Sequence, residues 1–208
     1  MSIENDLTAR RIIPVVVLND AKDAEPLADA LVKGDLPVAE VTFRTAAAAD
    51  SIKAMAARGD MLVGAGTVIT TAQVEQAIEA GAKFIVSPGF SPAVVKACQE
   101  AKIPVFPGAV TASEIQAALE FGLTTLKFFP AETSGGVKAI KAFTAPFGQV
   151  KFIPTGGVGP ANLMDYLSVP AVAAVGGSWM VASKLVEAGD FAKITELSAQ
   201  AVAMAKEA

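Results

Sequence analysis

Short apolar runs rich in valine, isoleucine and phenylalanine alternate along the chain with alanine-rich stretches of helical periodicity. A buried parallel strand reads as a near-continuous apolar run, and each such strand needs a crossover helix before the next one. The alternation therefore predicts an α/β fold built on a parallel sheet. The eight candidate strands lie at residues 12–18, 37–43, 61–67, 84–88, 104–107, 125–129, 151–155 and 173–176.

Eight strands alternating with helices predict a parallel (β/α)8 barrel, the TIM barrel, as the fold class. We expect a short N-terminal helix at residues 3–10 and a closing helical segment at 182–207. No linker or low-complexity stretch interrupts the alternation, which predicts a single domain over residues 1–208. A doubly wound parallel sheet would show the same alternation and stays open as the alternative. In a barrel the strand ends gather at the C-terminal rim, where active sites of this fold lie.

Two helix starts carry recognisable signals. Thr111 is followed three residues later by Glu114, which is the capping-box spacing. Ser91 precedes Pro92, an N-cap residue followed by proline at the first helical position. Both signals support the segmentation into strands and helices.

The amino-acid composition limits which catalytic groups and which classes of ligand are possible. The chain has no histidine and a net charge of −4. The lack of histidine excludes Ser-His and Cys-His nucleophile pairs, histidine general bases and histidine-ligated metals, so acid–base chemistry must use carboxylates, lysine, tyrosine or water. The negative charge argues against nucleic-acid binding, and no apolar run approaches the ~18 residues of a membrane span. A hydrophobic content of 52% favours a deeply packed core and is compatible with a buried subunit contact.

The cellular compartment is expected to be the cytoplasm. Residues 2–6 are polar and acidic, unlike the opening of a secretory signal peptide. The single cysteine, Cys98, cannot form an internal disulfide and falls on the apolar side of a predicted helix. We therefore expect a buried thiol without a chemical role.

One lysine lies inside a predicted strand. Strand alternation places Lys127 and Phe129 on one face and Leu126 and Phe128 on the other. An ammonium among such side chains loses hydration, and burial favours the neutral amine, which attacks carbonyl groups. Lys127 is therefore a candidate Schiff-base former. On this stretch alone, a lysine whose stem packs while its head reaches water is the preferred interpretation.

The second strand carries charged residues on one face. Period two places Glu40, Thr42 and Arg44 together. In a closed barrel this face would point inward, so that an acid and a guanidinium would share the interior near the rim. A structural ion pair is the alternative, but an interior acid is costly unless it is paired or used. With Lys127 on another inward face, a functional role is favoured.

Three glycine-rich segments end predicted strands. Residues 64–67 lack the third glycine of a dinucleotide-binding motif, and Asp60 precedes them instead of following, so we interpret them as close packing with the Thr67 hydroxyl inward. Residues 155–158 and 176–178 follow the last two strands, where barrels often bind phosphate through glycine N–H groups. Tight turns explain either loop alone, but the two together favour a phosphate site.

These motifs together give the chain a family resemblance. From about residue 12 to residue 189, with every motif in family order, it resembles the class I aldolases that act on 2-keto-3-deoxy-6-phosphogluconate (KDPG) and 4-hydroxy-2-oxoglutarate (KHG). The strings Lys-Phe-Phe-Pro-Ala-Glu at 127–132 and Gly-Ala-Gly-Thr at 64–67 are the most specific. The other motifs that carry the resemblance are Glu40, Arg44, residues 87–89 and residues 155–157.

The resemblance implies a (β/α)8 barrel, usually a homotrimer, that needs no metal and no organic cofactor. Such an enzyme cleaves the phosphorylated keto-deoxy sugar acid to pyruvate and glyceraldehyde 3-phosphate. By motif, Lys127 would be the Schiff-base lysine and Glu40 the proton-transfer residue. The expected partner is thus a small phosphorylated keto acid.

The resemblance also implies the binding residues. Arg44 and Thr67 would hold the pyruvate carboxylate and neighbouring oxygens, while Pro88 and Phe129 would line the pocket. Arginine suits a carboxylate because its planar fork binds both oxygens. The phosphate would be received by Gly156, Gly157, Gly177 and Ser178.

One departure from the family pattern concerns the phosphate. Some relatives carry a basic residue at the end of the first strand, where this chain has Asn19, and Lys22 is a candidate substitute. Two other function classes also stay open at this point. One is another barrel enzyme of phosphorylated small molecules, such as an epimerase or a transferase like thiamine-phosphate synthase. The other is a non-catalytic protein that binds phosphorylated metabolites.

Overall fold

The computed structural model describes residues 3–207. Met1, Ser2 and Ala208, which belong to the predicted domain, with Ser2 also in the polar opening stretch, lie outside the described residues. Each candidate strand corresponds to an observed one, although β4 and β5 are only two residues long. The strands are β1 (Ile12–Val16), β2 (Val38–Thr42), β3 (Leu62–Gly66), β4 (Ile85–Val86), β5 (Val105–Phe106), β6 (Thr125–Phe128), β7 (Lys151–Pro154) and β8 (Val175–Gly177).

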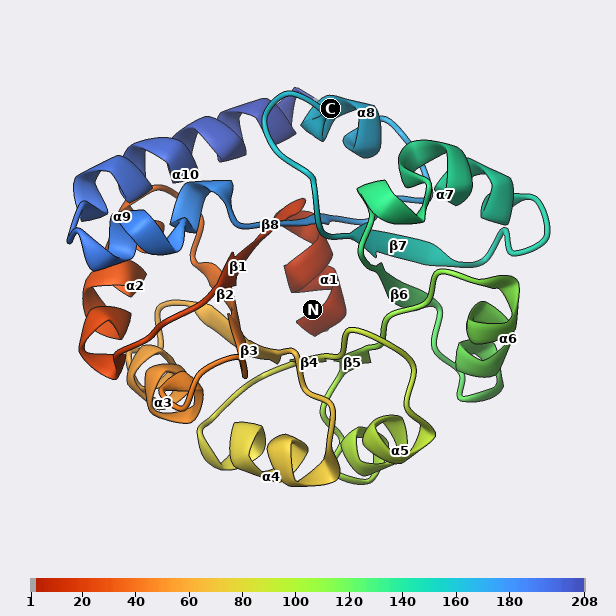
Figure 1. Ribbon diagram of the computed structural model, residues 1–208, viewed down its shortest axis with the longest axis horizontal. Helices are drawn as coiled ribbons and strands as arrows, with labels where there is room; N and C mark the ends of the chain where they lie inside the picture. The colour runs from red at the N-terminus through yellow and green to blue at the C-terminus, as the bar shows by residue number, and fades with distance from the viewer. Residues whose placement is uncertain (1–2, 208) are drawn as a thin grey trace.

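All strand pairs are parallel. Six strands form one sheet in the order β5-β4-β3-β2-β1-β8, and β6 pairs with β7 in a second sheet. Single parallel bridges link the two sheets, between Gly108 and Lys127 on one side of the β6–β7 pair and between Thr155 and Gly176 on the other. The strands curl around a common centre, and the helices other than α1 lie outside them (Figure 1). The architecture is therefore the parallel α/β arrangement that the alternating pattern predicts.

The helices follow the strands in regular alternation. The α-helices are α1 (Ile3–Ala9), α2 (Ala24–Lys33), α3 (Ala48–Ala57), α4 (Thr71–Glu79), α5 (Pro92–Glu100), α6 (Ala112–Glu120), α7 (Gly136–Thr144), α8 (Leu163–Leu167), α9 (Ser183–Glu187) and α10 (Phe191–Lys206). Short 3-10 helices occur as η1 (Ala21–Asp23), η2 (Glu132–Ser134) and η3 (Trp179–Val181). Among the described residues, no helix combines the length and apolarity needed to cross a membrane.

The first helix, α1, confirms the predicted N-terminal helix. It runs directly into the start of β1, and Figure 1 shows it at the centre of the ring of strands. Its Leu7 is fully buried. Helix α1 therefore covers the end at which the strands begin and leaves the opposite end, where the strands stop, to the connecting loops.

The predicted helix starts are also confirmed. The Thr111 side chain accepts a hydrogen bond from the backbone N–H of Glu114, and the Glu114 carboxylate accepts one from the backbone N–H of Thr111, which completes a capping box. Ser91 caps α5 in front of Pro92. Each cap satisfies donors that a helix start otherwise leaves unpaired.

The main core lies between the strands and the helices. Phe128 of β6 faces outward and packs edge-on against Phe143 of α7 and Phe152 of β7, with ring centroids 6.5 and 5.9 Å away. Cys98 of α5 is fully buried in the same layer, and burial raises the pKa of its thiol to about 11. The structure confirms the prediction that this thiol is buried.

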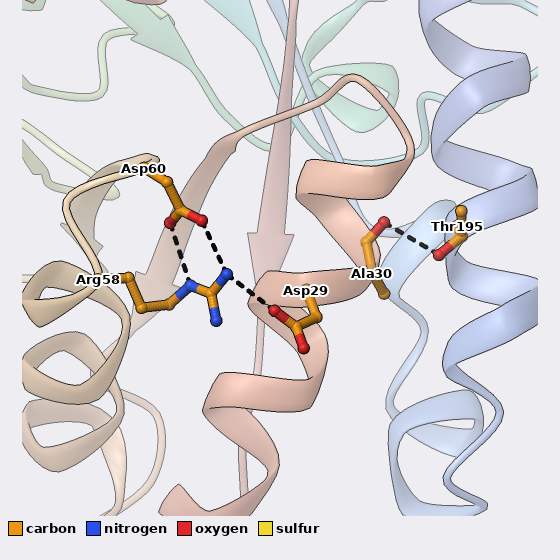
Figure 2. Close-up of polar contacts among 5 residues, drawn as sticks. All are labelled: Asp29, Ala30, Arg58, Asp60 and Thr195. Carbon is orange, nitrogen blue, oxygen red and sulfur yellow. Dashed lines mark hydrogen bonds and ion pairs between the residues drawn. The ribbon is translucent and has the colours of Figure 1, made fainter.

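Polar contacts on the outside fasten neighbouring helices (Figure 2). Two guanidinium N–H groups of Arg58, just after α3, donate to the Asp60 carboxylate at 3.0 and 2.8 Å. The same group forms an ion pair with Asp29 of α2 at 2.8 Å. On the other side of α2, the Thr195 hydroxyl of α10 donates to the Ala30 carbonyl at 3.1 Å. Helix α2 is thereby tied to both of its neighbours.

Candidate active site

A lysine and a glutamate form a buried pair inside the ring of strands. Lys127 lies in β6 and Glu40 in β2, and they are only 5% and 2% exposed. The Lys127 ammonium nitrogen Nζ donates a hydrogen bond to Glu40 Oε1 over 2.9 Å. Leu126 and Phe128, which flank Lys127, are fully buried on the outward side. The structure thus confirms the alternation predicted for this strand and brings two residues 87 positions apart into contact.

Strand register explains how Glu40 reaches this position. Glu40 lies opposite Gly64 of β3 in the parallel ladder, and Thr42 lies opposite Gly66. A Cβ atom on Gly66 would lie 2.3 Å from Glu40 Oε1, and one on Gly64 would lie 2.3 Å from the Phe84 ring. The two glycines therefore leave room for neighbouring side chains. This close packing is the role predicted for residues 64–67.

Besides the Glu40 carboxylate, an aromatic ring lies near the Lys127 ammonium. The Phe129 ring centroid lies 5.4 Å from Nζ, within the range of a cation–π contact. Removing two charges from water is costly, and mutual attraction repays the cost only in part. Passing the ammonium proton to the carboxylate 2.9 Å away would leave a neutral amine and a neutral acid. The geometry therefore places an amine, a group that can attack carbonyl carbons, in direct contact with a carboxylate that can accept a proton.

Thr42 and Arg44, which were predicted on the same strand face as Glu40, lie in different environments. Thr42 is buried, and its hydroxyl donates to the Val16 carbonyl at 2.9 Å, so it joins β2 to β1. Arg44 lies two residues beyond the end of β2 and is exposed. Strand alternation therefore accounts for Glu40 and Thr42 but not for Arg44, which is positioned by the loop after the strand.

Two predicted binding residues lie at neighbouring strand ends. Thr67 comes directly after β3 and is half-buried, with a left-handed φ of 56°. This conformation is uncommon for a non-glycine residue and turns the backbone sharply at the strand end. Pro88 follows β4, and a Cβ on Gly108 would lie only 2.0 Å from the Pro88 carbonyl oxygen. Gly108 in turn forms a backbone bridge to Lys127. Thr67 directly follows Gly66, which packs against Glu40, and Pro88 packs against Gly108, which bridges to Lys127. Both residues therefore lie close to the buried pair.

A cavity of about 520 Å³ opens beside the buried pair. Of the predicted site residues, Lys127, Glu40, Thr67 and Pro88 do not line it. Phe129 connects the two regions because its ring contacts the Lys127 ammonium and also lines the cavity. The lining residues are Val15, Val17, Arg44, Phe129, Thr155, Gly156, Gly157, Val158, Gly176, Gly177, Ser178, Val181, Ala182 and Ser183.

The two glycine-rich loops meet in this cavity. Gly156 and Gly157 have φ values of 99° and 80°, which favour glycine. Gly177 and Ser178 come from the end of β8 and line the same space. All four residues predicted to receive a phosphate therefore lie together.

The residues that follow the first strand do not supply the positive charge expected of them at this cavity. Among the described residues that line the cavity, only Arg44 carries a charge. Lys22 is exposed and forms an ion pair with Asp20 at 2.9 Å, and Asn19 donates to Glu187 at 3.0 Å. Neither Asn19 nor Lys22 lines the cavity, so the structure does not bring Lys22 to the predicted phosphate loops.

Some cavity residues were not predicted as site residues. Thr155 is buried, and its Oγ1 lies 2.2 Å from where a Cβ on Gly176 would be, so its hydroxyl occupies the gap between β7 and β8. Its place directly before Gly156 is the signal that could have found it. Val158 lies in the same segment, 155–158. Val15, Val17, Val181 and Ser183 carry no such signal, because only the fold brings them to this end of the strands. Among the described residues, no cluster of three or more acidic, cysteine or histidine side chains could hold a metal ion.

Comparison with known proteins gives consistent results. The family model described as "KDPG and KHG aldolase" matches residues 3–197. The KHG/KDPG aldolase of Escherichia coli K12 is 47% identical over 206 residues, 99% of this chain and 97% of that protein. The 2-dehydro-3-deoxy-phosphogluconate aldolase of Treponema pallidum is 50% identical over 191 residues, 91% of each protein. The crystal structure of the Legionella pneumophila KDPG aldolase, with pyruvate captured as a covalent carbinolamine, superposes with a TM-score of 0.93 at 40% identity, covering 96% of this chain and 98% of that one.

Proposed function

This chain belongs to the KDPG and KHG aldolase family, and from that membership we propose that it is a class I aldolase, a carbon–carbon lyase that works through a Schiff base. Its substrate is KDPG, which it cleaves to pyruvate and glyceraldehyde 3-phosphate. It also cleaves KHG to pyruvate and glyoxylate. The observation that carries the proposal is the hydrogen bond of 2.9 Å between the buried amine of Lys127 and the carboxylate of Glu40.

In the proposed reaction, Lys127 passes a proton to Glu40 and attacks the C2 ketone of the substrate. Glu40 returns that proton as the carbinolamine loses water, which gives an iminium. The iminium withdraws electrons from the bond between C3 and C4. Glu40, acting through a water, removes the C4 hydroxyl proton as this bond breaks. The pyruvate enamine left on Lys127 is protonated at C3, and hydrolysis then releases pyruvate.

The remaining site residues bind and orient the substrate in this proposal. Arg44, the charged residue of the cavity lining, binds the pyruvate carboxylate with both arms of its guanidinium. The Thr67 hydroxyl holds a neighbouring oxygen. Pro88 and Phe129 form an apolar wall beside the imine. The contact between the Phe129 ring and Lys127 Nζ supports this last role.

We further propose that the phosphate of KDPG binds at the two glycine loops. Gly156 and Gly157 from the end of β7 meet Gly177 and Ser178 from the end of β8 around one cavity. Backbone N–H groups and a hydroxyl can surround a phosphate there without a nearby lysine. Few lining charges also suit a site that accepts the unphosphorylated KHG.

We infer that the eight strands close into a TIM barrel and that residues 1–208 act as one domain. The bridges on both sides of the β6–β7 pair and the pairing of β1 with β8 support closure, and a doubly wound sheet would leave two edges. We also propose a cytoplasmic homotrimer that takes part in the Entner–Doudoroff pathway. The exposed apolar side chains of Ile69 and Ile78 near α4 offer part of a subunit contact.

The experiment is a coupled assay of pyruvate release with KDPG and, separately, with KHG. The proposal predicts steady release from KDPG without added metal or cofactor. Glyceraldehyde 3-phosphate should appear in equal amount. Binding of KDPG without release of pyruvate would favour a non-catalytic binding protein. Conversion of KDPG to an isomer of unchanged mass would favour an epimerase.

A further inference from the structure

A tyrosine and a glutamate form a hydrogen-bonded pair directly behind the Gly156–Gly157 loop. Tyr166 of α8 is 1% exposed, and its hydroxyl donates to the Glu132 carboxylate. Glu132 opens η2 and is itself exposed. Burial and then the adjacent carboxylate raise the pKa of Tyr166, so that the phenol stays protonated and remains a donor.

Glu132 contacts the loop through both its backbone and its side chain. Its N–H donates to the Gly156 carbonyl at 3.2 Å. A Cβ on Gly157 would lie 2.5 Å from Glu132 Cγ, so the glutamate stem packs flat against that glycine. Asn162, at the start of α8, donates to the Gly157 carbonyl at 3.1 Å. The bond between Tyr166 and Glu132 therefore joins two elements that both hold the loop.

The position of the Glu132 charge is the unusual feature. A carboxylate this close to Gly157 would repel a phosphate bound at the loop. However, Glu132 does not line the cavity, because its Oε1 is held by Tyr166 beside Gly136. A Cβ on Gly136 would lie 3.1 Å from the Tyr166 hydroxyl and 3.2 Å from Glu132 Oε1, and its φ of 56° favours glycine. Two glycines, Gly136 and Gly157, thus leave space for this one pair.

We propose that Tyr166 is a positioning residue that selects for phosphorylated substrates by holding the Glu132 carboxylate against α8. This contact fixes the Gly156–Gly157 loop and keeps the negative charge turned away from the phosphate. The inference rests on the proposed function and adds to it the residue on which phosphate preference depends. Loss of the tyrosine hydroxyl frees a carboxylate next to the anion, whereas neutralising that carboxylate removes the repulsion.

The test compares Tyr166→Phe, Glu132→Gln and the double variant, with Glu75→Gln on the exposed face of α4 as a matched control. Each protein is assayed for kcat and KM with KDPG and with KHG. Tyr166→Phe should raise KM for KDPG about tenfold, the effect of one charge-assisted hydrogen bond, and change KM for KHG less than about twofold. The double variant should recover much of the KDPG affinity, because the freed charge is gone.

A merely structural contact predicts other results. Equal losses on both substrates, or a double variant no better than Tyr166→Phe, would overturn the inference. If Tyr166→Phe does not fold, Glu132→Asp serves instead, because its shorter side chain cannot reach Tyr166 and keeps the charge. That variant should show the same selective rise in KM for KDPG, and an unchanged KM would contradict the inference.

The outcome can be separated from failure of the proposed function. If the unmodified protein cleaves neither keto acid, the aldolase assignment fails. Binding of inorganic phosphate, measured by isothermal titration calorimetry, then tests the role of the Tyr166–Glu132 pair separately from catalysis. Weaker phosphate binding in Tyr166→Phe that the double variant restores supports the inference. Equal affinity in all variants, or no binding by the unmodified protein, overturns it.

Discussion

Ion pairs of nearly the same length occur in two very different environments of this chain. Inside the ring of strands, Lys127 and Glu40 meet at 2.9 Å and are almost fully buried. On the outside, Arg58 contacts Asp60 and Asp29 at 2.8 Å, and the side chains of the two aspartates are 41% and 52% exposed (Figure 2). Distances do not distinguish the two sites, whereas access to water does.

The difference teaches why only one of these contacts suits catalysis. Water screens the outer charges, and a guanidinium keeps its proton, so that contact adds modestly to stability. In the buried site, two separated charges are costly to keep out of water, and the Lys127 amine lies in direct contact with the Glu40 carboxylate. We therefore expect changes to the inner pair to affect chemistry strongly and changes to the outer group to affect stability slightly.

The largest effect is expected from Lys127→Gln. The amide can still donate to Glu40, which protects the fold, but it cannot form an imine. Pyruvate release from KDPG should become undetectable while the circular dichroism spectrum stays unchanged. Lys96→Met, at an exposed position of α5, is the control and should keep full activity. Residual activity of Lys127→Gln near that of the unmodified chain would remove the proposed nucleophile.

Glu40→Gln should have the next largest effect. Loss of a positioned acid–base group lowers kcat by about 10² to 10⁴, with little change in KM. Rapid-quench kinetics with pyruvate and borohydride should show an adduct that forms slowly but still on Lys127. A kcat within twofold of the unmodified chain would show that Glu40 is only a structural partner.

Gly66→Ala tests whether the position of Glu40 matters as much as its charge. The added methyl would lie 2.3 Å from Glu40 Oε1, so the carboxylate must move away from Lys127. We expect kcat to fall by about tenfold or more and stability to fall by about 1–3 kcal/mol from overpacking. Gly148→Ala, whose Cβ would meet only ordinary contacts, is the control. Crystal structures of both variants would reveal whether Glu40 has moved.

Arg58→Ala should have the smallest effect. Activity should be unchanged, and the melting temperature should fall by about 3 °C or less at neutral pH. The Arg58 guanidinium lowers the pKa of Asp60 below 3.8, so its contribution is complete above pH 3.8 and is lost as the pH falls through the lowered pKa. Melting curves of the two proteins should therefore converge in strong acid. A difference that grows on acidification would contradict this account of the outer contact.

Sequence reasoning recovered the strands because buried parallel strands have a nearly pure apolar signature. Alternation also predicted that Lys127 points inward, because the apolar side chains of Leu126 and Phe128 must pack outward against the helices. The same alternation predicted that the Glu40 side chain points inward. These inferences depend only on residues within one strand, where sequence spacing and geometry are directly related.

Contacts between distant segments could not be predicted in the same way. The clearance that Gly66 provides for Glu40 depends on the register of β2 and β3. Tyr166 reaches Glu132 across 34 positions, and nothing in either local pattern indicates the contact. Lys22 looked suitable as a phosphate ligand by its place in the chain, yet it pairs with Asp20. Such features follow from packing, which a single sequence does not display.

The most direct test of the central claim is to trap the intermediate between pyruvate and the chain. The protein is incubated with pyruvate, reduced with borohydride, and digested for mass spectrometry. The account predicts one pyruvate-derived adduct per chain, located on Lys127 and absent from Lys127→Gln. An unmodified chain, or an adduct on any other lysine, would contradict it.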